Sequence, residues 1–410
     1  MISIQSTIRG VLLIAMTCLL SAPLAAQVAV QGETVYTMAG PPIKNGVIII
    51  RDGKIAEIGT ADDVTIPDDF KVVKAPIVVP GLIDAHTVVG LGGMLNQDGD
   101  QDQLENSQPV QPALRAKDAY NGKDKLVDWI RSFGVTTIHT GHGPGELISG
   151  QTMIVKTTGN TVEDAMLVDA YAVAATLDNA ARKSGGSSPG TRGKMIAMLR
   201  TQLIKATEYQ AKIDAAEKED DRPARDLELE ALADVLAGKT PLMVTADRAQ
   251  DIDSALRLAN EFGFRLILDS AAESYLLIDE IKNADVPVII HPTMARATGD
   301  RENMSFETAA KLVAAGIPVA MQSGFEGYVP KTRVVLFEAG YAAANGLSFE
   351  QALGTITIDA AKLLGIDEKV GSLEVGKDAD VALFDGDPFE YTTHCVGVLI
   401  NGQVVSDQPR

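Results

Sequence analysis

Histidines and carboxylates gather in this sequence where apolar runs end. Four of the five histidines lie at such points, and imidazole can bind a divalent metal or transfer a proton near neutral pH. They are His86, His139, His142 and His291. Nearby carboxylates could add oxygen ligands or a general base, namely Asp84, Asp247, Asp269, Glu273 and Glu326. These residue types point to metal-assisted or acid–base chemistry.

Strand-like runs alternate with helical patterns through the middle of the chain, which is typical of βα units around a parallel sheet. Eight runs fit a (β/α)8 barrel and cover residues 78–86, 135–140, 152–157, 170–176, 241–246, 264–269, 286–291 and 317–322. Helical patterns cover residues 251–262, 272–283, 305–315 and 348–364. Because such barrels carry their active sites where the strands end, the histidines are expected at one mouth.

Three further segments have clear local signals. Residues 191–238 are rich in Ala, Lys, Glu and Leu and predict two helices broken at Pro223, inserted on the barrel. Both chain ends are rich in short strands, with an Asp52-Gly53 turn near the start and an Asn401-Gly402 turn near the end. An Asp-Gly or Asn-Gly pair between apolar runs predicts a β-hairpin.

The run Val79-Pro80-Gly81-Leu82-Ile83-Asp84-Ala85-His86 resembles the first barrel strand of the amidohydrolase superfamily, in its imidazolonepropionase and dihydroorotase-like branch. The resemblance extends over residues 28–407. It implies an α/β fold with a TIM barrel over residues 76–369 and a composite β-sandwich built from residues 28–75 and 370–407. It also implies hydrolysis of a non-peptide C–N bond, for example in a cyclic amide.

That family takes its metal ligands from His-x-His on the first strand, a carboxylated Lys or a Glu on the fourth, one His each on the fifth and sixth, and an Asp on the eighth. His86 matches the first ligand, and residues 166–182 contain no Lys, His or Glu for the fourth strand. The other positions hold side chains that bind transition metals poorly, which are Val88, Thr245, Ser270 and Gly324. The sequence therefore predicts at most one divalent metal, with zinc the best match, and keeps a metal-free site as the alternative.

A relocated site remains open, built from the histidines at the strand ends. Its expected members are His139, His142 and Asp247 as catalytic residues, His86 and His291 as metal ligands, and Arg248, Glu273 and Glu326 as substrate-binding residues. Lys156 is expected to form an ion pair within the barrel, with a catalytic role as the alternative. The rival function is a catalytically inactive barrel that binds a small molecule or a partner protein.

The composition limits location and partners. Residues 1–26 have a short basic start, an apolar stretch of about ten residues and a small-residue exit, which predicts a signal peptide and an exported protein, periplasmic or secreted. Lipid attachment at Cys18 is a second interpretation, and removal of the leader leaves Cys395 without a disulfide partner. The formal net charge of −19 disfavours nucleic acid as a partner. We expect a small-molecule substrate and no transmembrane segment in the mature chain, and a homo-oligomer stays open.

Overall fold

The computed structural model describes residues 27–95, 97–294, 296–324 and 334–410. The strands within these residues are β1 (Val28–Val35), β2 (Ile43–Arg51), β3 (Lys54–Thr60), β4 (Lys71–Pro80), β5 (Leu82–Thr87), β6 (Val135–Thr140), β7 (Ile148–Gln151), β8 (Met153–Lys156), β9 (Met166–Val168), β10 (Val173–Thr176), β11 (Leu242–Thr245), β12 (Leu266–Ser270), β13 (Val288–Ile290), β14 (Val319–Met321), β15 (Val381–Phe384), β16 (Cys395–Ile400) and β17 (Gln403–Ser406). The α-helices are α1 (Lys125–Ser132), α2 (Val162–Ala165), α3 (Arg192–Ala215), α4 (Leu227–Leu236), α5 (Ala249–Phe262), α6 (Ile278–Asn283), α7 (Thr308–Ala314), α8 (Val335–Ala344), α9 (Phe349–Gly354) and α10 (Ile358–Leu363).

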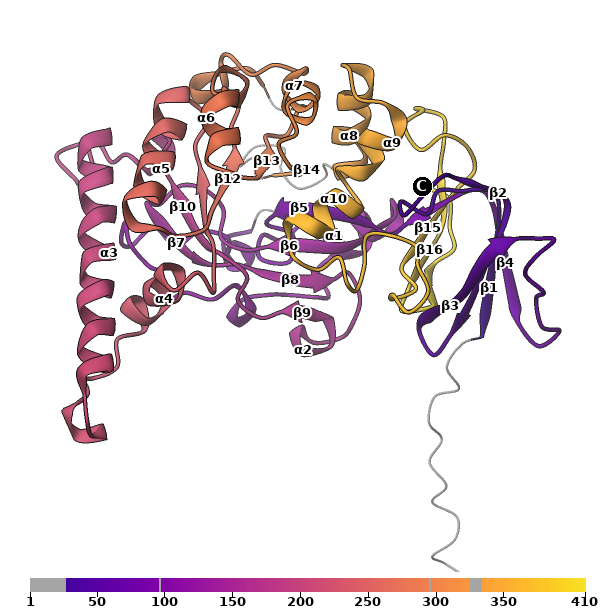
Figure 1. Cartoon of the computed structure of the whole chain (residues 1–410), viewed down its shortest axis with the longest axis horizontal. Coiled ribbons are helices and arrows are strands. Elements are labelled where there is room, and N and C mark those ends of the chain that lie inside the picture. The colour runs from indigo at the N-terminus through magenta and orange to yellow at the C-terminus, as the bar shows by residue number, and fades with distance from the viewer. Residues whose placement is uncertain (1–26, 96, 295, 325–333) are drawn as a thin grey trace, which may run out of the picture.

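Both chain ends build one β domain beside the barrel (Figure 1). Its sheet has the order β17-β16-β15-β4-β1-β2-β3, so C-terminal strands pair directly with β4 of the N-terminal segment. Apolar side chains from β1, β2, β4, β15 and β16 share one buried cluster. The composite β-sandwich fold is confirmed, and both predicted hairpins form, β2 with β3 and β16 with β17.

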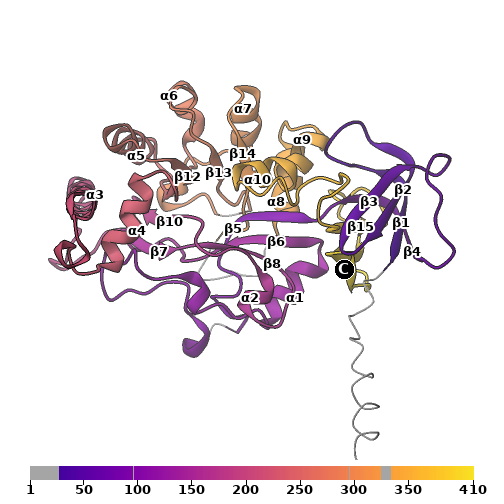
Figure 2. The ribbon, with the colours of Figure 1, turned by 60° about the horizontal axis from the view of Figure 1, so that its bottom comes forward.

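The remaining strands form a closed barrel. One sheet has the order β14-β13-β12-β11-β10-β7 and another the order β5-β6-β8-β9. The continuous segment of β7 and β8 joins the two sheets, and a parallel bridge between Thr87 and Gly324 closes the ring. Helices α3 to α7 stand in an arc outside β10 to β14 (Figure 2). The predicted TIM-barrel class is confirmed.

The third strand of the barrel corrects the expectation of a fully parallel sheet. Strand β8 runs antiparallel to β6, and β7 runs antiparallel to β10. Only residues 141–147 connect β6 to β7, and no helix lies among them. A parallel return needs a crossover of roughly a dozen residues or more, so this short loop can only turn the chain back from the mouth.

The predicted strand 78–86 is divided at Gly81. Strand β4 ends in the β domain at Pro80, and β5 begins in the barrel at Leu82. A Cβ atom on Gly81 would lie 2.1 Å from the Thr136 hydroxyl oxygen, so only glycine allows this close approach between the first two barrel strands. His86 thereby remains on a barrel strand with its end at the mouth.

The helical predictions hold in part. The insertion forms α3 and α4 with Pro223 in the break, and α3 extends from the body of the molecule (Figure 1). The expected helix 348–364 divides into α9 and α10, because the carbonyls of Thr355 and Ile356 accept hydrogen bonds from the backbone of Met321 and Ile83. These carbonyls are therefore taken by the barrel strands rather than by a continuous helix.

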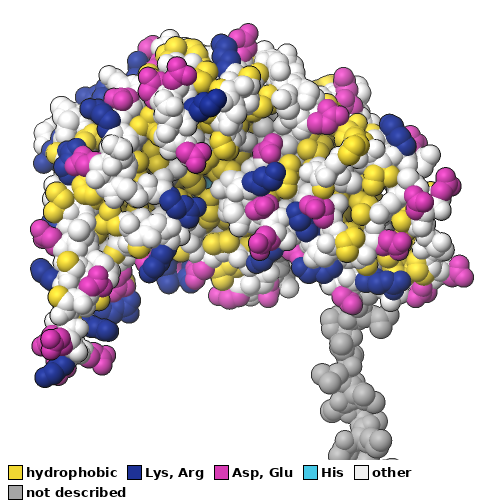
Figure 3. All heavy atoms as spheres, in the orientation of Figure 1, with side chains coloured by type: hydrophobic (Ala, Val, Ile, Leu, Met, Phe, Trp, Pro, Cys, Tyr) yellow, Lys and Arg dark blue, Asp and Glu magenta, His cyan; other side chains and the backbone are white. Residues whose placement is uncertain are grey.

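The surface mixes both signs of charge. Lys and Arg side chains alternate with Asp and Glu side chains across the face in Figure 3, between small apolar areas. Among the helices that the structure describes, none combines the length and apolar character needed to span a bilayer.

Lys156 lies at the junction of the barrel and the β domain. Because β8 runs away from the mouth, its last residue meets the C-terminal segment at the opposite end of the barrel. The ammonium group lies 2.7 Å from Asp378 Oδ2 and 3.0 Å from Asp380 Oδ2, and it donates to Asn401 Oδ1. Lys156 forms an ion pair as expected, but with the β domain rather than within the barrel, and its position removes it from the chemistry at the mouth.

Candidate active site

A cavity of about 170 Å³ opens at the C-terminal mouth of the barrel. It is polar, and acidic side chains are the largest group in its wall. The lining residues are His86, Pro144, Asp178, Ala180, Thr245, Asp247, Asp269, Ser270, Pro292, Thr298, Asp300, Arg301 and Gln322. Candidate His86 and candidate Asp247 both face this one cavity, at the place where barrel enzymes carry out their chemistry.

His86 and Asp269 form a buried pair across the mouth. His86 Nδ1 lies 2.8 Å from Asp269 Oδ1, and each side chain is at most 3% exposed. Strand β11 and the segment after β14 hold the carboxylate in place, because Thr245 donates to Oδ2 at 2.6 Å and Gln322 donates to Oδ1 at 2.9 Å. Asp269 is therefore anchored by strands β11 and β12 and by the segment after β14.

Each member of the pair shifts the pKa of the other. Burial, the largest single effect, lowers the pKa of His86, but the charge and hydrogen bond of Asp269 together with the charge of Asp84 outweigh it, so this pKa lies above the ordinary histidine value. Burial raises the pKa of Asp269, but the His86 ring and the hydrogen bonds from Thr245 and Gln322 bring that pKa below the ordinary aspartate value. Asp269 therefore stays ionised and fixes a proton on His86 Nδ1.

The other ring nitrogen of His86 is available. Among the described residues, no group forms a hydrogen bond with His86 Nε2, although the atom is buried. Buried polar atoms in folded proteins nearly always have a partner, and an exception often marks a catalytic position or a bound molecule. In the neutral ring this nitrogen carries a lone pair, so His86 can accept a proton from a molecule in the cavity.

Asp84 supports the same strand from behind. Its Oδ1 accepts the Ser323 backbone N–H at 3.0 Å, and its Oδ2 accepts the Ser323 hydroxyl. Burial raises the pKa of Asp84 to about 7, although the bonds from Ser323 and His86 act in the opposite direction. Because both oxygens are engaged within the barrel wall, Asp84 positions β5 rather than facing the cavity.

The other histidines do not join His86 at the cavity. The His139 ring lies 5.6 Å from the His86 ring, but its nitrogens contact the Ala85 carbonyl at 2.6 Å and the Thr152 hydroxyl at 2.7 Å. Burial lowers the pKa of His139 to about 3 and that of His142 to about 4. Neither His142 nor His291 is among the residues that line the cavity. The structure thus brings one histidine, not four, into the cavity wall.

Of the polar side chains predicted to belong to the site, some line the cavity and others lie outside it. Asp247 lines the cavity, and its Oδ1 accepts the Ser270 hydroxyl at 2.6 Å. Arg248 lies outside the lining and pairs with Asp300 and Glu302. Glu273 accepts the Ala249 N–H at 2.7 Å at the start of α5, which is a structural role. The predicted Glu326 lies outside the described residues.

The structure adds cavity residues that sequence reasoning did not select, namely Asp178, Asp300, Arg301 and Gln322. Asp178 is not one of the residue types expected on the fourth strand, yet an aspartate two residues after a strand is a usable signal. Gln322, directly after β14, carries the same signal. Asp300 and Arg301 carry no comparable local signal, because they lie farther along the segment that follows β13.

The side chains at the mouth do not fit a transition-metal site. A catalytic zinc needs about three protein ligands, and among the described residues no three His, Cys, Asp or Glu side chains converge in that way. His86 Nδ1 is engaged by Asp269, and both oxygens of Asp269 already accept hydrogen bonds from Thr245, Gln322 and His86. Thr245 and Ser270 stand at the ends of β11 and β12, where the family resemblance would place histidines.

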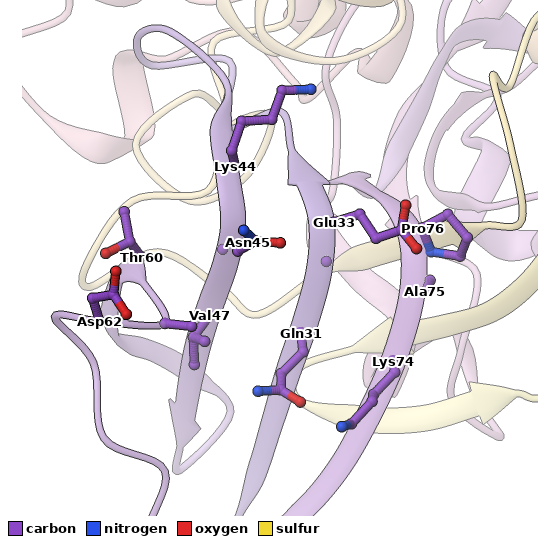
Figure 4. Close-up of a pocket in the computed structure, with 13 residues that line it drawn as sticks. Gln31, Glu33, Lys44, Asn45, Val47, Thr60, Asp62, Lys74, Ala75 and Pro76 are labelled. Carbon is purple, nitrogen blue, oxygen red and sulfur yellow. The ribbon is translucent and has the colours of Figure 1, made fainter.

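A larger hollow lies elsewhere, on the β domain (Figure 4). It measures about 620 Å³, and polar side chains of the N-terminal strands line it, including Gln31, Lys44, Thr60 and Lys74. No barrel residue contributes to its wall, and it lacks a buried acid–base pair. The smaller cavity at the mouth, which holds the His86–Asp269 pair, is therefore the candidate active site.

Known proteins share this architecture and sequence. A solved amidohydrolase from Thermotoga maritima MSB8 superposes with a TM-score of 0.86 and is 26% identical, covering 93% of this chain and 100% of that one. An imidazolonepropionase from Thermoplasma volcanium is 24% identical over 90% of this chain and 92% of its own length. The amidohydrolase tasK of Hapsidospora irregularis is 25% identical over 90% of this chain, which spans only 40% of that longer protein.

The family assignment covers most of the chain. The model of the amidohydrolase family, Amidohydro_3, matches residues 91–406. This range includes every barrel strand after β5 and the C-terminal strands of the β domain. The chain belongs to the amidohydrolase family.

Proposed function

We propose that this protein hydrolyses the C–N bond of a small amide or cyclic amide and that His86, rather than a metal, activates the water. The observation that carries the proposal is the buried His86–Asp269 pair, with Nδ1 held at 2.8 Å and Nε2 without a partner among the described residues. A histidine oriented by a carboxylate and open at its second nitrogen is the usual form of a general base. Family membership supports the reaction class.

The proposed reaction balances with water alone. His86 Nε2 removes a proton from water while the water oxygen forms a bond to the amide carbon. The same proton then passes to the leaving nitrogen as the C–N bond breaks, giving a carboxylic acid and an amine. Arg301 lines the cavity and can stabilise negative charge on the carbonyl oxygen in between.

A panel of small amides and lactams tests this proposal, with release of amine or ammonia as the measurement. We expect turnover of at least one compound small enough for a cavity of about 170 Å³. That volume lies below the roughly 300–1,000 Å³ of pockets for drug-sized ligands, so bulky amides should fail. Turnover of bulky amides only would contradict the assignment of this cavity.

Chelation should leave the reaction intact. Because the donors at the mouth are engaged with one another, we expect activity to survive dialysis against a chelator and metal content to stay below one equivalent. Elemental analysis and the same amide assay, before and after dialysis, provide the measurement. Loss of activity that zinc restores would show that a metal site forms despite these contacts.

A second candidate is a binding protein without chemistry. The observation in its favour is the same one that argues against a metal, since no three donors converge among the residues that the structure describes and the usual catalyst of this family is a metal. The amide panel separates the two functions. Ligands that bind at the mouth but are never cleaved would establish the binding protein.

We also propose export. The basic, apolar and small-residue pattern of residues 1–26 supports it. The full-length chain, expressed in a bacterium with two membranes, is expected in the periplasmic fraction, with a mature N-terminus near Ala26 by peptide sequencing. An intact N-terminus in the cytoplasmic fraction would overturn this proposal.

A further inference from the structure

One of the four acidic side chains in the cavity wall, Asp178, has no basic partner among the described residues. Three of the four carboxyl groups in the cavity wall have a basic side chain nearby. Asp269 has His86 at 2.8 Å, Asp300 has Arg248 at 3.1 Å, and Asp247 has Arg301 at 3.7 Å. Among the described residues, no Lys or Arg forms an ion pair with the fourth, Asp178, whose Oδ1 accepts the Asp247 backbone N–H at 2.8 Å.

Asp178 is a buried acid in a negative field. Asp178 lies just after β10 and is 5% exposed. Burial raises the pKa of Asp178 well above its ordinary value, and the charges of Asp247, Asp300 and Asp251 raise it further. Without an opposite charge nearby, this buried side chain favours its neutral form, and a cation entering the cavity would stabilise the carboxylate form and be bound beside it.

A second observation marks the cavity as a ligand site. His86, 3% exposed, lines the same cavity and has an Nε2 atom without a partner among the described residues. The cavity wall thus contains a histidine nitrogen without a hydrogen-bond partner and, at Asp178, a carboxyl group without a basic partner.

We infer that the ligand of this cavity is a small amide that carries a positively charged ammonium or guanidinium group, bound beside Asp178. The inference rests on the proposed function for the amide part and on Asp178 for the charge. His86 would face the scissile bond, while Asp178 orients the cationic end. A neutral or anionic amide would leave Asp178 without a partner and should bind less well.

Binding can be tested without chemistry. Calorimetry on the unmodified protein at pH 7 would compare n-butylammonium with n-butanol, which have similar size and no amide bond. We expect the cation alone to bind, and Asp178→Asn to weaken its binding by about tenfold or more. Asparagine keeps an oxygen that can accept the Asp247 N–H, so the fold should be retained.

A matched control removes an equal charge elsewhere. Asp253→Asn lies on the exposed side of α5, where Asp253 is 50% exposed and pairs with Arg257, and it should leave cation binding unchanged. Equal binding of both probes, no binding of the cation, or the same loss in both variants would overturn the inference.

Turnover separates this inference from the proposed function. If hydrolysis occurs, γ-aminobutyramide should show a higher kcat/KM than γ-hydroxybutyramide, and Asp178→Asn should remove the difference mainly through KM. Cation-selective binding without hydrolysis would retain the ligand class and reject the reaction. Hydrolysis without preference for the cation would retain the reaction and reject the ligand class.

Discussion

His86→Gln should reduce kcat for the best amide substrate by roughly 10²- to 10⁴-fold, the usual contribution of a general base. Glutamine preserves polarity and approximate volume but cannot take up the proton of the attacking water. Because His86 Nε2 is the unpartnered nitrogen in the cavity wall, no other histidine is positioned to replace it. Steady-state kinetics on the amide panel would measure the loss.

Asp269→Asn separates orientation from proton transfer. The amide can still contact His86 Nδ1, but it no longer stabilises the protonated ring, so the pKa of His86 should fall. The base is the neutral ring, and the rate therefore rises as pH passes upward through the pKa of His86. In Asp269→Asn this rise in rate should occur at lower pH. At pH values above the rise, kcat should be lower than in the unmodified protein.

The control for both variants is a histidine far from the mouth. His394 is 53% exposed and pairs with Asp385 in the C-terminal segment, so His394→Gln should leave kcat unchanged. Circular dichroism and urea unfolding check that the buried substitutions fold. A folded His86→Gln protein with undiminished kcat would contradict the proposed role of His86.

Local signals in the sequence predict this fold to a large extent. Strand β6 has the predicted bounds, 135–140, and the Asp-Gly and Asn-Gly turns produce the expected hairpins. The direction of β7 and β8 was not predicted, because strand patterns carry no direction and only the short connection 141–147 reveals it. The break between α9 and α10 likewise depends on which barrel strands take the carbonyls of Thr355 and Ile356.

The sequence predicts where the candidate site lies, but not which of its side chains form hydrogen bonds with one another. Strand ends identify His86 and Asp269 individually as candidates, yet they are 183 residues apart in sequence and meet only when the barrel closes. Histidines also look alike in sequence, whether both nitrogens are satisfied, as in His139, or one is open, as in His86. Hydrogen bonding, which only the folded chain determines, separates the two.

Lys156→Met is expected to lower the free energy of unfolding by about 3–5 kcal/mol at pH 7, the typical cost of leaving one partner of a buried ion pair alone. Lys156 is 4% exposed, and its ammonium group lies between Asp378 and Asp380. Asp380 is 3% exposed, and burial raises its pKa while Lys156 lowers it. Without Lys156, this carboxylate must stay buried and unpaired or take up a proton.

Lys54→Met makes the same exchange of side chain at a neighbouring position and serves as the control. Lys54 is 52% exposed and pairs with Asp378, which would still contact Lys156, so the loss should remain within about 1 kcal/mol. Urea unfolding at pH 7 and pH 5 would measure both variants. Because a lower pH protonates the unpaired Asp380, the deficit of Lys156→Met should narrow at pH 5, and Asp380→Asn in the same chain should recover much of it. Equal losses in the two lysine variants would show that the junction between barrel and β domain does not depend on the buried pair.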